Sequence, residues 1–224
     1  MDDLKLKRTN HKKDRDAVRK KLYVKYMLCS RDKLLVKSIL NTQKLDYRIS
    51  VHGAIELYDE VTQVQVDKLG SKLSKSCMVL LDEKESMLID RIINTIIEVI
   101  HYSDTLPKLT FKDFVNELSV SGNESILKIF SNVKGMSVLQ FIVIQKIERA
   151  KEMLLYEDIP IQEIADLLNY KSEDLLKAQF KKTTGLELLY FKQLKKERMK
   201  IAEKNNSTSY SRVKDSGASF YIEL

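Results

Sequence analysis

The chain has few of the residues that several classes of protein depend on. Its 224 residues include 2 cysteines, 2 prolines, 6 glycines and no tryptophan. Two cysteines cannot form a disulfide framework or a four-thiolate zinc site by themselves. The shortage of glycine and proline disfavours β-sandwiches and long loops, which use many turn residues, and favours a helix-rich protein.

Long apolar runs are also missing. No stretch approaches the roughly 20 uninterrupted apolar residues that a membrane-spanning helix needs, and the basic N-terminus lacks the apolar segment of a secretory signal. We therefore expect a cytoplasmic protein that does not associate with a membrane. The apolar share of 43% and the charged share of 32% exclude disorder throughout, and the length suits one or two domains.

The net charge of +7 indicates a polyanionic partner, but the charge is spread unevenly. Residues 1–22 carry nine Lys or Arg and four Asp, whereas residues 107–202 carry sixteen basic and thirteen acidic residues. Residues 1–21 have almost nothing apolar to bury, so we expect a disordered basic arm. This arm is open to two interpretations, a phosphate-binding extension and a solubilising tail. Residues 201–224 are rich in Asn, Ser, Thr and Gly and are also expected to be disordered.

Predicted strands alternate with predicted helices in residues 22–82. Thr62 and Gln65 form a capping box at the start of one helix, and His52-Gly53 is expected to be a two-residue hairpin turn. We predict strands at 22–28, 46–51, 54–58 and 77–81, and helices at 32–45 and from Thr62 onward. The order βαββαβ predicts a ferredoxin-like domain.

The loop Met27-Leu-Cys29-Ser-Arg-Asp32 resembles that of the heavy-metal-associated domain, in which two cysteines of a Met-x-Cys-x-x-Cys pattern hold a soft metal ion. Asp32 stands in place of the second cysteine, and a Cys/Asp pair is a poorer ligand set for a soft metal. We therefore favour an unliganded Cys29 over a metal-binding one, and predict no metal site and no cofactor. We expect Cys77 to lie in the core. None of the three histidines lies at ligand spacing from another His or Cys.

The second half of the chain contains an internal repeat. At an offset of fifty residues, the segment from Phe111 to Met136 aligns without a gap with the segment from Ile161 to Leu186. The matched pairs include Phe114 with Ile164, Val115 with Ala165, Leu118 with Leu168, Phe130 with Phe180, and Gly135 with Gly185. Each copy is predicted to hold two helices, at 110–119 and 122–134 and at 161–169 and 172–183. This is the pattern of a helix-turn-helix unit, whose second helix presents its N-terminal outer face to the DNA major groove.

Two longer helices are predicted around the first copy. One spans residues 83–103, and the other spans residues 137–156 and opens on a capping box of Ser137 and Gln140. The second of these links the two copies and is expected to hold them at a fixed separation. Two recognition helices about 34 Å apart can enter successive major grooves on one face of the duplex.

On these features the chain resembles the AraC/XylS family of bacterial transcription regulators. From about Leu88 onward it is most similar to short AraC-like proteins from Bacteroidetes-type bacteria. Asn169 stands where a turn glycine is customary, and Leu188 where a proline is. The matching residues are Phe141, Lys146, Ala150, Leu154, Ile161, Ile164, Ala165, Tyr170, Leu176, Phe180, Lys181, Lys182, Gly185, Phe191 and Lys192.

The resemblance implies an α+β protein in which a small ferredoxin-like domain precedes an all-α double helix-turn-helix domain over residues 83–200. It implies a sequence-specific DNA-binding transcription regulator that is not an enzyme and that lies at the nucleoid in the cytoplasm. Double-stranded DNA is the implied partner, with RNA polymerase and a second copy of the chain as further partners. The alternative is a non-catalytic adaptor for protein interaction or metal handling, in which the helix-turn-helix has lost DNA binding. The acidic starts of the predicted recognition helices favour that alternative.

Candidate DNA contacts follow from the exposed N-terminal positions of the two recognition helices. Side chains that can pair with base edges are Asn123, Ser125, Lys128, Lys171, Ser172, Glu173 and Lys177. Side chains better placed for phosphates are Lys181, Lys182, Lys192, Lys195 and Lys196. Glu124, Glu173 and Asp174 have a second interpretation, in which they complement the helix dipole in a first turn.

Overall fold

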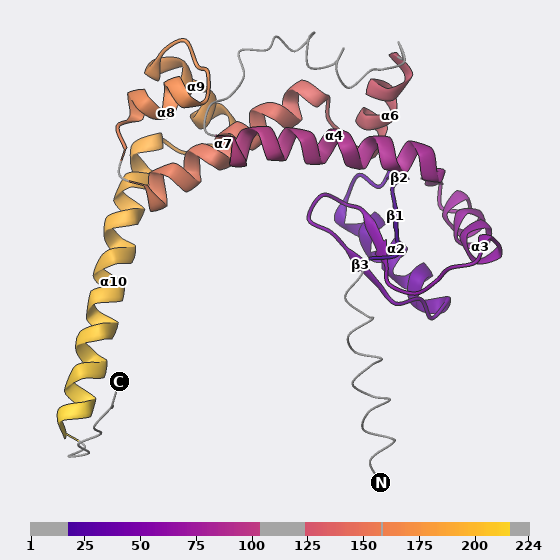
Figure 1. Cartoon of the computed structure of the whole chain (residues 1–224), viewed down its shortest axis with the longest axis horizontal. Coiled ribbons are helices and arrows are strands. Elements are labelled where there is room, and N and C mark those ends of the chain that lie inside the picture. The colour runs from indigo at the N-terminus through magenta and orange to yellow at the C-terminus, as the bar shows by residue number, and fades with distance from the viewer. Residues whose placement is uncertain (1–17, 104–123, 158, 216–224) are drawn as a thin grey trace. The chain divides into compact units, whose positions relative to one another are not determined.

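The computed structural model describes residues 18–103, 124–157 and 159–215 (Figure 1). These residues form two compact units, of which the first holds residues 18–102 and 124–143 and the second holds residue 103 and the residues from Ile144 onward. Within the described residues, every strand lies between Lys20 and Leu80, and helices make up most of the rest. The protein is therefore of the mixed α+β class, as the sequence predicts. Most of the predicted arm and the last nine residues lie outside the described ranges.

The strands of the first unit form two small antiparallel sheets. Their bounds are β1 Lys20–Leu22, β2 Val24–Lys25, β3 Tyr47–Ile49, β4 Ile55–Leu57 and β5 Val79–Leu80. One sheet has the order β1-β4-β3 and the other pairs β2 with β5. The first predicted strand is thus divided at Tyr23, whose N–H donates to Ser86 Oγ at 3.2 Å and whose carbonyl accepts from Leu81 at 2.9 Å. The elements follow the order βαββαβ, with the first strand in two parts.

Two helices cover one side of these strands. They are α2 (Ser30–Thr42) and α3 (Gln63–Ser74). The predicted capping box at α3 is confirmed, because the Gln65 N–H donates to Thr62 Oγ1 at 3.3 Å and the Thr62 N–H donates to Gln65 Oε1 at 2.9 Å. Buried apolar side chains from both helices and from the strands form one core, which includes Leu22, Val36, Leu40, Ile55, Leu57, Leu69 and Leu73.

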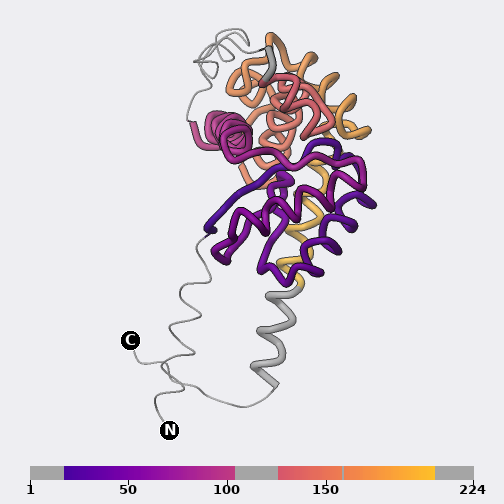
Figure 2. Tube along the Cα trace, turned by 90° about the vertical axis from the view of Figure 1, so that its right-hand side faces the viewer, coloured from indigo at the N-terminus to yellow at the C-terminus, as the bar shows by residue number. Residues whose placement is uncertain are grey.

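Helix α4 (Glu83–Tyr102) packs against β1 through an apolar face and a small polar network. The Tyr23 hydroxyl donates to Asp90 Oδ1 at 3.0 Å, and Lys21 Nζ lies 3.3 Å from Asp90 Oδ2. Burial, with the Asp90 carboxylate beside it, raises the pKa of Tyr23, so the phenol stays protonated. Figure 2 shows α4 nearly end-on beside the strands and the other helices of this unit.

Two local predictions in the first unit are wrong. The turn between β3 and β4 extends from Ser50 to Ala54, because the Ser50 N–H donates to the Ala54 carbonyl at 2.9 Å and Ser50 Oγ accepts from the Ala54 N–H at 3.0 Å. Cys77 does not lie in the core, because it follows α3 in a turn with φ of +59° that leaves its side chain exposed. Both differences arise where the chain changes direction.

Asp32 has a structural role at the start of α2. Its carboxylate accepts hydrogen bonds from the N–H groups of Leu28 at 2.9 Å and Cys29 at 3.0 Å, so it caps the helix. Hydrogen bonds from Cys29, and the one from Leu28, hold the pKa of Asp32 below its ordinary value. Helix capping therefore explains an acidic residue at this position. Among the described residues, no group of three or more His, Cys, Asp or Glu side chains comes together.

The second unit is built from helices. Helix α7 (Val138–Tyr156) begins in the first unit and continues into the second, and it is followed by α8 (Ile161–Leu167), α9 (Glu173–Thr184) and α10 (Leu188–Asp215). The predicted capping box at α7 is confirmed, since Ser137 and Gln140 exchange hydrogen bonds of 2.8 and 3.2 Å. The core holds Ile147, Ala150, Met153, Leu154, Ile164, Ala165, Leu168, Leu176, Phe180 and Leu188.

Helix α10 extends further than the sequence indicates. We expected order to end near residue 200, but the helix continues to Asp215. Helix propagation costs less than nucleation, so a helix that has started at Leu188 can continue into residues of poor helix propensity. Among the helices of the described ranges, none alone is long and apolar enough to cross a membrane. The segment Ile126–Lys134 passes that test only as a pair with α7, from which it is bent by 55°.

Candidate nucleic-acid interface

Helices α8 and α9 are joined by a tight turn. Asn169 adopts the left-handed conformation with φ of +53°. The turn is closed by two backbone hydrogen bonds, from Asn169 to Asp166 at 3.0 Å and from Tyr170 to Ala165 at 2.8 Å. Asn tolerates this conformation better than most residues because its short polar side chain can bond locally. The replacement of the customary glycine therefore preserves the turn.

Buried apolar side chains of α8 and α9 belong to one core. Ala165 and Phe180 are both fully buried, and the small side chain of Ala165 leaves room for the second helix. The Phe180 ring meets the Phe191 ring edge-on at 5.1 Å, which ties α9 to α10. The geometry of α9 is therefore fixed from both sides by apolar packing.

Lys146 on α7 holds the turn in place. Its Nζ donates to the Leu168 carbonyl at 2.8 Å and lies 5.5 Å from the centre of the Tyr170 ring. Burial lowers the pKa of Lys146 and raises that of Tyr170 to about 12. This half-buried lysine therefore stabilises the turn between α8 and α9.

Carboxylates neutralise part of the outer surface of α9. Lys177 Nζ lies 2.6 Å from Glu173 Oε1 and 3.7 Å from Asp174 Oδ1. The hydrogen bond from Lys177 to Glu173 raises the pKa of the lysine. Lys181 is paired in the same way with Glu187, at 2.5 Å, which also raises its pKa. These ion pairs reduce the positive charge that both lysines offer to a phosphate or a base, although each ammonium has further N–H groups to donate.

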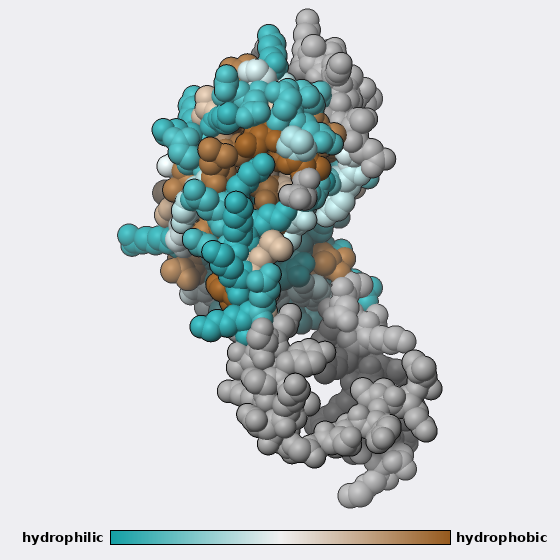
Figure 3. Space-filling model, turned by 90° about the vertical axis from the view of Figure 1, so that its left-hand side faces the viewer, coloured by the Kyte–Doolittle hydropathy of each residue, from teal (hydrophilic) through white to brown (hydrophobic). Residues whose placement is uncertain are grey.

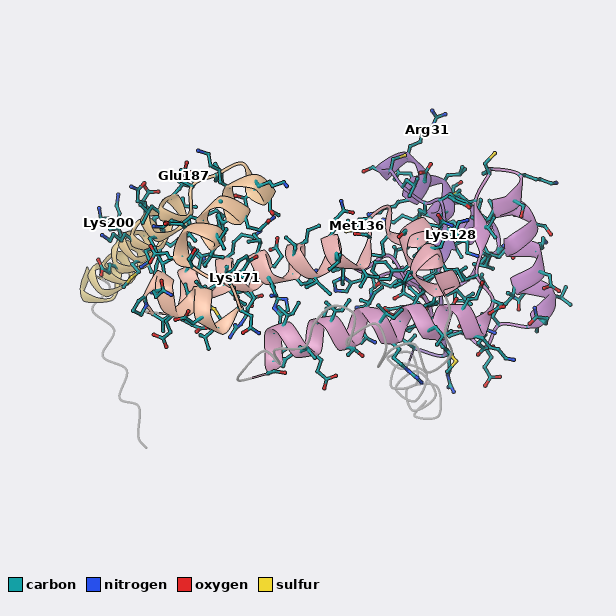
Figure 4. All side chains as sticks on the ribbon, turned by 90° about the horizontal axis from the view of Figure 1, so that it is seen from above. Arg31, Lys128, Met136, Lys171, Glu187 and Lys200 are labelled. Carbon is teal, nitrogen blue, oxygen red and sulfur yellow. The ribbon has the colours of Figure 1, made fainter. Side chains whose placement is uncertain are left out.

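Ser172 is the N-cap of α9. Its hydroxyl accepts a hydrogen bond from the Leu175 N–H at 3.3 Å. The hydroxyl proton remains free to donate elsewhere. Lys171, the residue before the cap, is exposed (Figure 4). The predicted base-facing residues of this copy thus lie together at the start of α9, but Ser172, Glu173 and Lys177 already have partners there.

The phosphate candidates differ in their surroundings. Lys182 on α9 and Lys196 on α10 are exposed, while Lys192 is half-buried. Lys195 Nζ donates to the Glu157 carbonyl at 2.8 Å, which fastens α10 to the end of α7. Of the five predicted phosphate contacts, Lys182 and Lys196 are therefore the two that present an exposed ammonium with no ion pair recorded among the described residues.

The first copy of the repeat is described only in part. The predicted helix at 110–119 and Asn123 lie outside the described residues. Ser125 falls within α6 (Glu124–Lys134), where its side chain is not described. Lys128 is exposed on α6, one turn before Asn132 (Figure 4). Phe130 and Val133 are the buried residues of this helix.

Two apolar residues on the outer face of α9 escaped the sequence analysis. Leu175 is 50% exposed, and Ala178 is exposed three residues later, on the side away from the buried Leu176 and Phe180. Small apolar groups can contact the methyl group of thymine. The helical spacing of Leu175 and Ala178 from Leu176 and Phe180 places them on this outer face. They are not among the predicted DNA contacts because those were chosen for polar side chains. Figure 3 shows a face of the molecule on which brown apolar side chains are bordered by hydrophilic ones.

Comparison with known proteins gives one family and several similar structures. Residues 115–193 match the family model described as a helix-turn-helix domain. A similar solved structure is the C-terminal domain of AraT, a response regulator from Geobacillus stearothermophilus, which is 24% identical, covers 48% of this chain and 84% of that chain, and has a TM-score of 0.41. No curated protein sequence matches the chain.

Two further solved structures are similar at lower identity. The DNA-binding domain of AdpA, a global transcriptional factor in complex with a target DNA, is 15% identical, covers 49% of this chain and 94% of that chain, and has a TM-score of 0.42. The xylose-binding transcription activator XylR is 16% identical, covers 73% of this chain and 37% of that chain, and has a TM-score of 0.39.

Proposed function

We propose that the chain is a sequence-specific DNA-binding transcription regulator of the AraC type, because residues 115–193 match the family model of a helix-turn-helix domain. The observation that carries the proposal is the complete second unit, in which α8, the left-handed turn at Asn169 and α9 are closed by a buried core. This arrangement leaves the N-terminal part of α9 at the surface, where a recognition helix meets the major groove. The protein acts by binding, without a catalytic step.

The proposed mode of binding uses both copies of the repeat. Helices α6 and α9 enter successive major grooves on one face of the duplex. The support is the fifty-residue repeat and the unbroken α7 between the two copies, from Val138 to Tyr156. RNA polymerase and a second copy of the chain are the further partners we propose, and the protein works in the cytoplasm at the DNA.

We assign the exposed residues to two roles. Lys128 and Lys171 reach base edges, and Ser172 donates its hydroxyl proton there while its oxygen continues to cap α9. Asn123, Ser125, Glu173 and Lys177 stay candidates for the same role. The phosphates are bound by Lys182 and Lys196 first, because both are exposed, and then by Lys181, Lys192 and Lys195.

For residues 22–82 we propose a ferredoxin-like fold and a role in sensing or dimerisation. If β1 and β2 are the two halves of one strand, the strands lie side by side in the order β5, β1 with β2, β4 and β3. These are the fourth, first, third and second strands of the βαββαβ pattern. Helices α2 and α3 on one side of the strands suit that fold.

A binding assay on fragments of the source genome tests the proposed function. Fluorescence anisotropy of the full chain at a series of salt concentrations is expected to reveal a few fragments with salt-sensitive, selective binding. A variant with Lys171, Lys182 and Lys196 changed to Gln should bind more weakly. A control with Lys44, Lys68 and Lys75 changed to Gln loses the same charge from exposed positions in the first unit and should bind normally. Equal affinity for every fragment, or no binding, would contradict the proposal.

A further inference from the structure

The C-terminal end of α6 is capped by the N-terminal domain. The last four carbonyls of a helix have no partner within it. The Ser131 carbonyl accepts from the Gly135 N–H at 2.8 Å, and the Asn132 carbonyl accepts from the N–H of Tyr26, just after β2, at 2.8 Å. A residue more than a hundred positions away therefore completes the first recognition helix.

The last residue of α6 makes a second contact with the same domain. Lys134 Nζ donates to the His52 carbonyl in the β3–β4 loop at 2.9 Å and lies 5.1 Å from the centre of the Phe141 ring. The buried Phe141 ring also meets the His52 ring edge-on, at 6.1 Å between centroids. Burial, and then repulsion from Lys33, lowers the pKa of Lys134 to about 8. The Lys134 ammonium is therefore partly desolvated where it donates to the His52 carbonyl.

The backbone at Tyr26 is also held at a cost. Tyr26 adopts φ of +68°, a conformation that a bulky residue rarely takes, although its side chain is 45% exposed and contributes little to the core. Close by, a Cβ placed on Gly135 would lie 3.2 Å from Leu28 Cδ2. A strained backbone and a desolvated cation occur in one contact between α6 and the N-terminal domain. Features of this kind persist where the surrounding structure holds them, and they gather at functional sites.

We propose that this contact, the α6 clamp formed by Tyr26, His52, Lys134 and Phe141, positions the first recognition helix for DNA. The N-terminal domain then contributes to DNA reading indirectly, because it holds α6 in position. The inference rests on the proposed function, and its four residues are positioning residues that do not touch the bases.

Amide hydrogen exchange in the free full chain tests the clamp without DNA. Lys134→Met keeps the aliphatic stem and removes the donor. We expect exchange at Tyr26 and in residues 130–135 to quicken roughly tenfold or more, because one charge-assisted hydrogen bond is lost, while α8 and α9 keep their rates. Lys84→Met, an exposed lysine of α4, is the control and should change neither region. Lys134→Arg, which can donate to the same carbonyl, should exchange as slowly as the wild type. If Lys134→Met fails to fold, the comparison of Lys134→Arg with the wild type still tests the clamp. Unchanged rates at Tyr26 in Lys134→Met, or no rescue by Lys134→Arg, would overturn the clamp.

Footprinting on a selected operator tests the consequence for DNA. Lys134→Met is expected to weaken protection of the half-site read by α6 by roughly tenfold in protein concentration and to leave the other half-site unchanged. Equal loss at both half-sites, or at neither, would overturn the inference. A wild-type chain that selects no sequence would refute the proposed function, whereas the exchange rates would still decide whether the clamp holds α6.

Discussion

The neighbours of Lys177 change the charge that this lysine presents to DNA. The sequence places it one turn into the second recognition helix, where a lysine can reach guanine. In the structure it is paired with Glu173 and Asp174, two acidic residues of the first turn of α9. The ion pair agrees with the interpretation of these carboxylates as partners of the helix N-terminus, and it lowers the charge that α9 presents to a phosphate backbone.

The change Glu173→Gln distinguishes the two interpretations of this carboxylate. If Glu173 has a structural role, its removal frees Lys177 and takes a negative charge from the DNA surface. DNA affinity should then rise roughly threefold to tenfold, with a steeper dependence on salt. Anisotropy titrations at several salt concentrations measure both, with Glu98→Gln on α4 as a control of equal charge. Weaker binding and a changed base preference would show instead that Glu173 reads a base.

Lys134 predicts a pH dependence of stability in the first unit. Its pKa is lowered to about 8 in the folded chain and returns to its ordinary value, about 10.4, on unfolding. Between these values the unfolded state binds more protons, so the free energy of unfolding should rise with pH across this window. Lys33 and His52 face the same ammonium. Because burial also lowers the pKa of His52, that ring stays neutral throughout.

Urea denaturation at a series of pH values between about 7.5 and 10 measures this effect in the wild-type chain and in Lys134→Met. Circular dichroism is a suitable signal, since the chain has no tryptophan. The difference in unfolding free energy between wild type and variant should shift in favour of the wild type as the pH rises. Curves that stay parallel across the window would mean that Lys134 titrates normally.

At the scale of single elements, helix starts were predictable, whereas two turns of the first unit were not. The capping boxes at Thr62 and Ser137 depend on residues three positions apart, so the sequence contains all the information they need. The β3–β4 turn and the exposed position of Cys77 depend on how neighbouring strands pair and on where α3 ends. Tyr23 is the clearest case, because its bonds to Ser86 and Leu81 divide a strand that looks continuous in the sequence.

The N-cap of α9 gives a prediction at this scale. Ser172→Ala removes the oxygen that accepts from the Leu175 N–H, and it should lower the free energy of unfolding of the second unit by about 1 kcal/mol. Ser172→Thr keeps an oxygen there and should lose less. Denaturation followed by circular dichroism measures the change. An unchanged stability together with weaker DNA binding would assign the hydroxyl to DNA alone.

At the scale of the whole molecule, the sequence predicts the internal repeat and features that depend on neighbouring residues. It does not predict contacts between segments that are far apart in the chain. The fifty-residue repeat identifies the helix-turn-helix domain because apolar residues recur at the same positions of both copies, and Phe130 and Phe180, one such pair, are both buried. Nothing local indicates that α6 packs with the N-terminal strands, since Lys134 and His52 are 82 positions apart. The region of the candidate site was predictable because the repeat locates the recognition helices. Which lysines are free of carboxylates depends on pairs such as Lys181 with Glu187, formed only after α9 and α10 meet.

Selection of bound sequences from a random DNA pool, with the full chain, is the most direct test of the central claim that this chain reads DNA with two recognition helices. The expected result is an enriched motif made of two half-sites whose centres lie about one helical turn, roughly 10 base pairs, apart. The same motif should be enriched less by the chain that carries Gln at Lys171, Lys182 and Lys196. A pool that stays random at low salt, or one that is enriched equally by that variant, would contradict the claim.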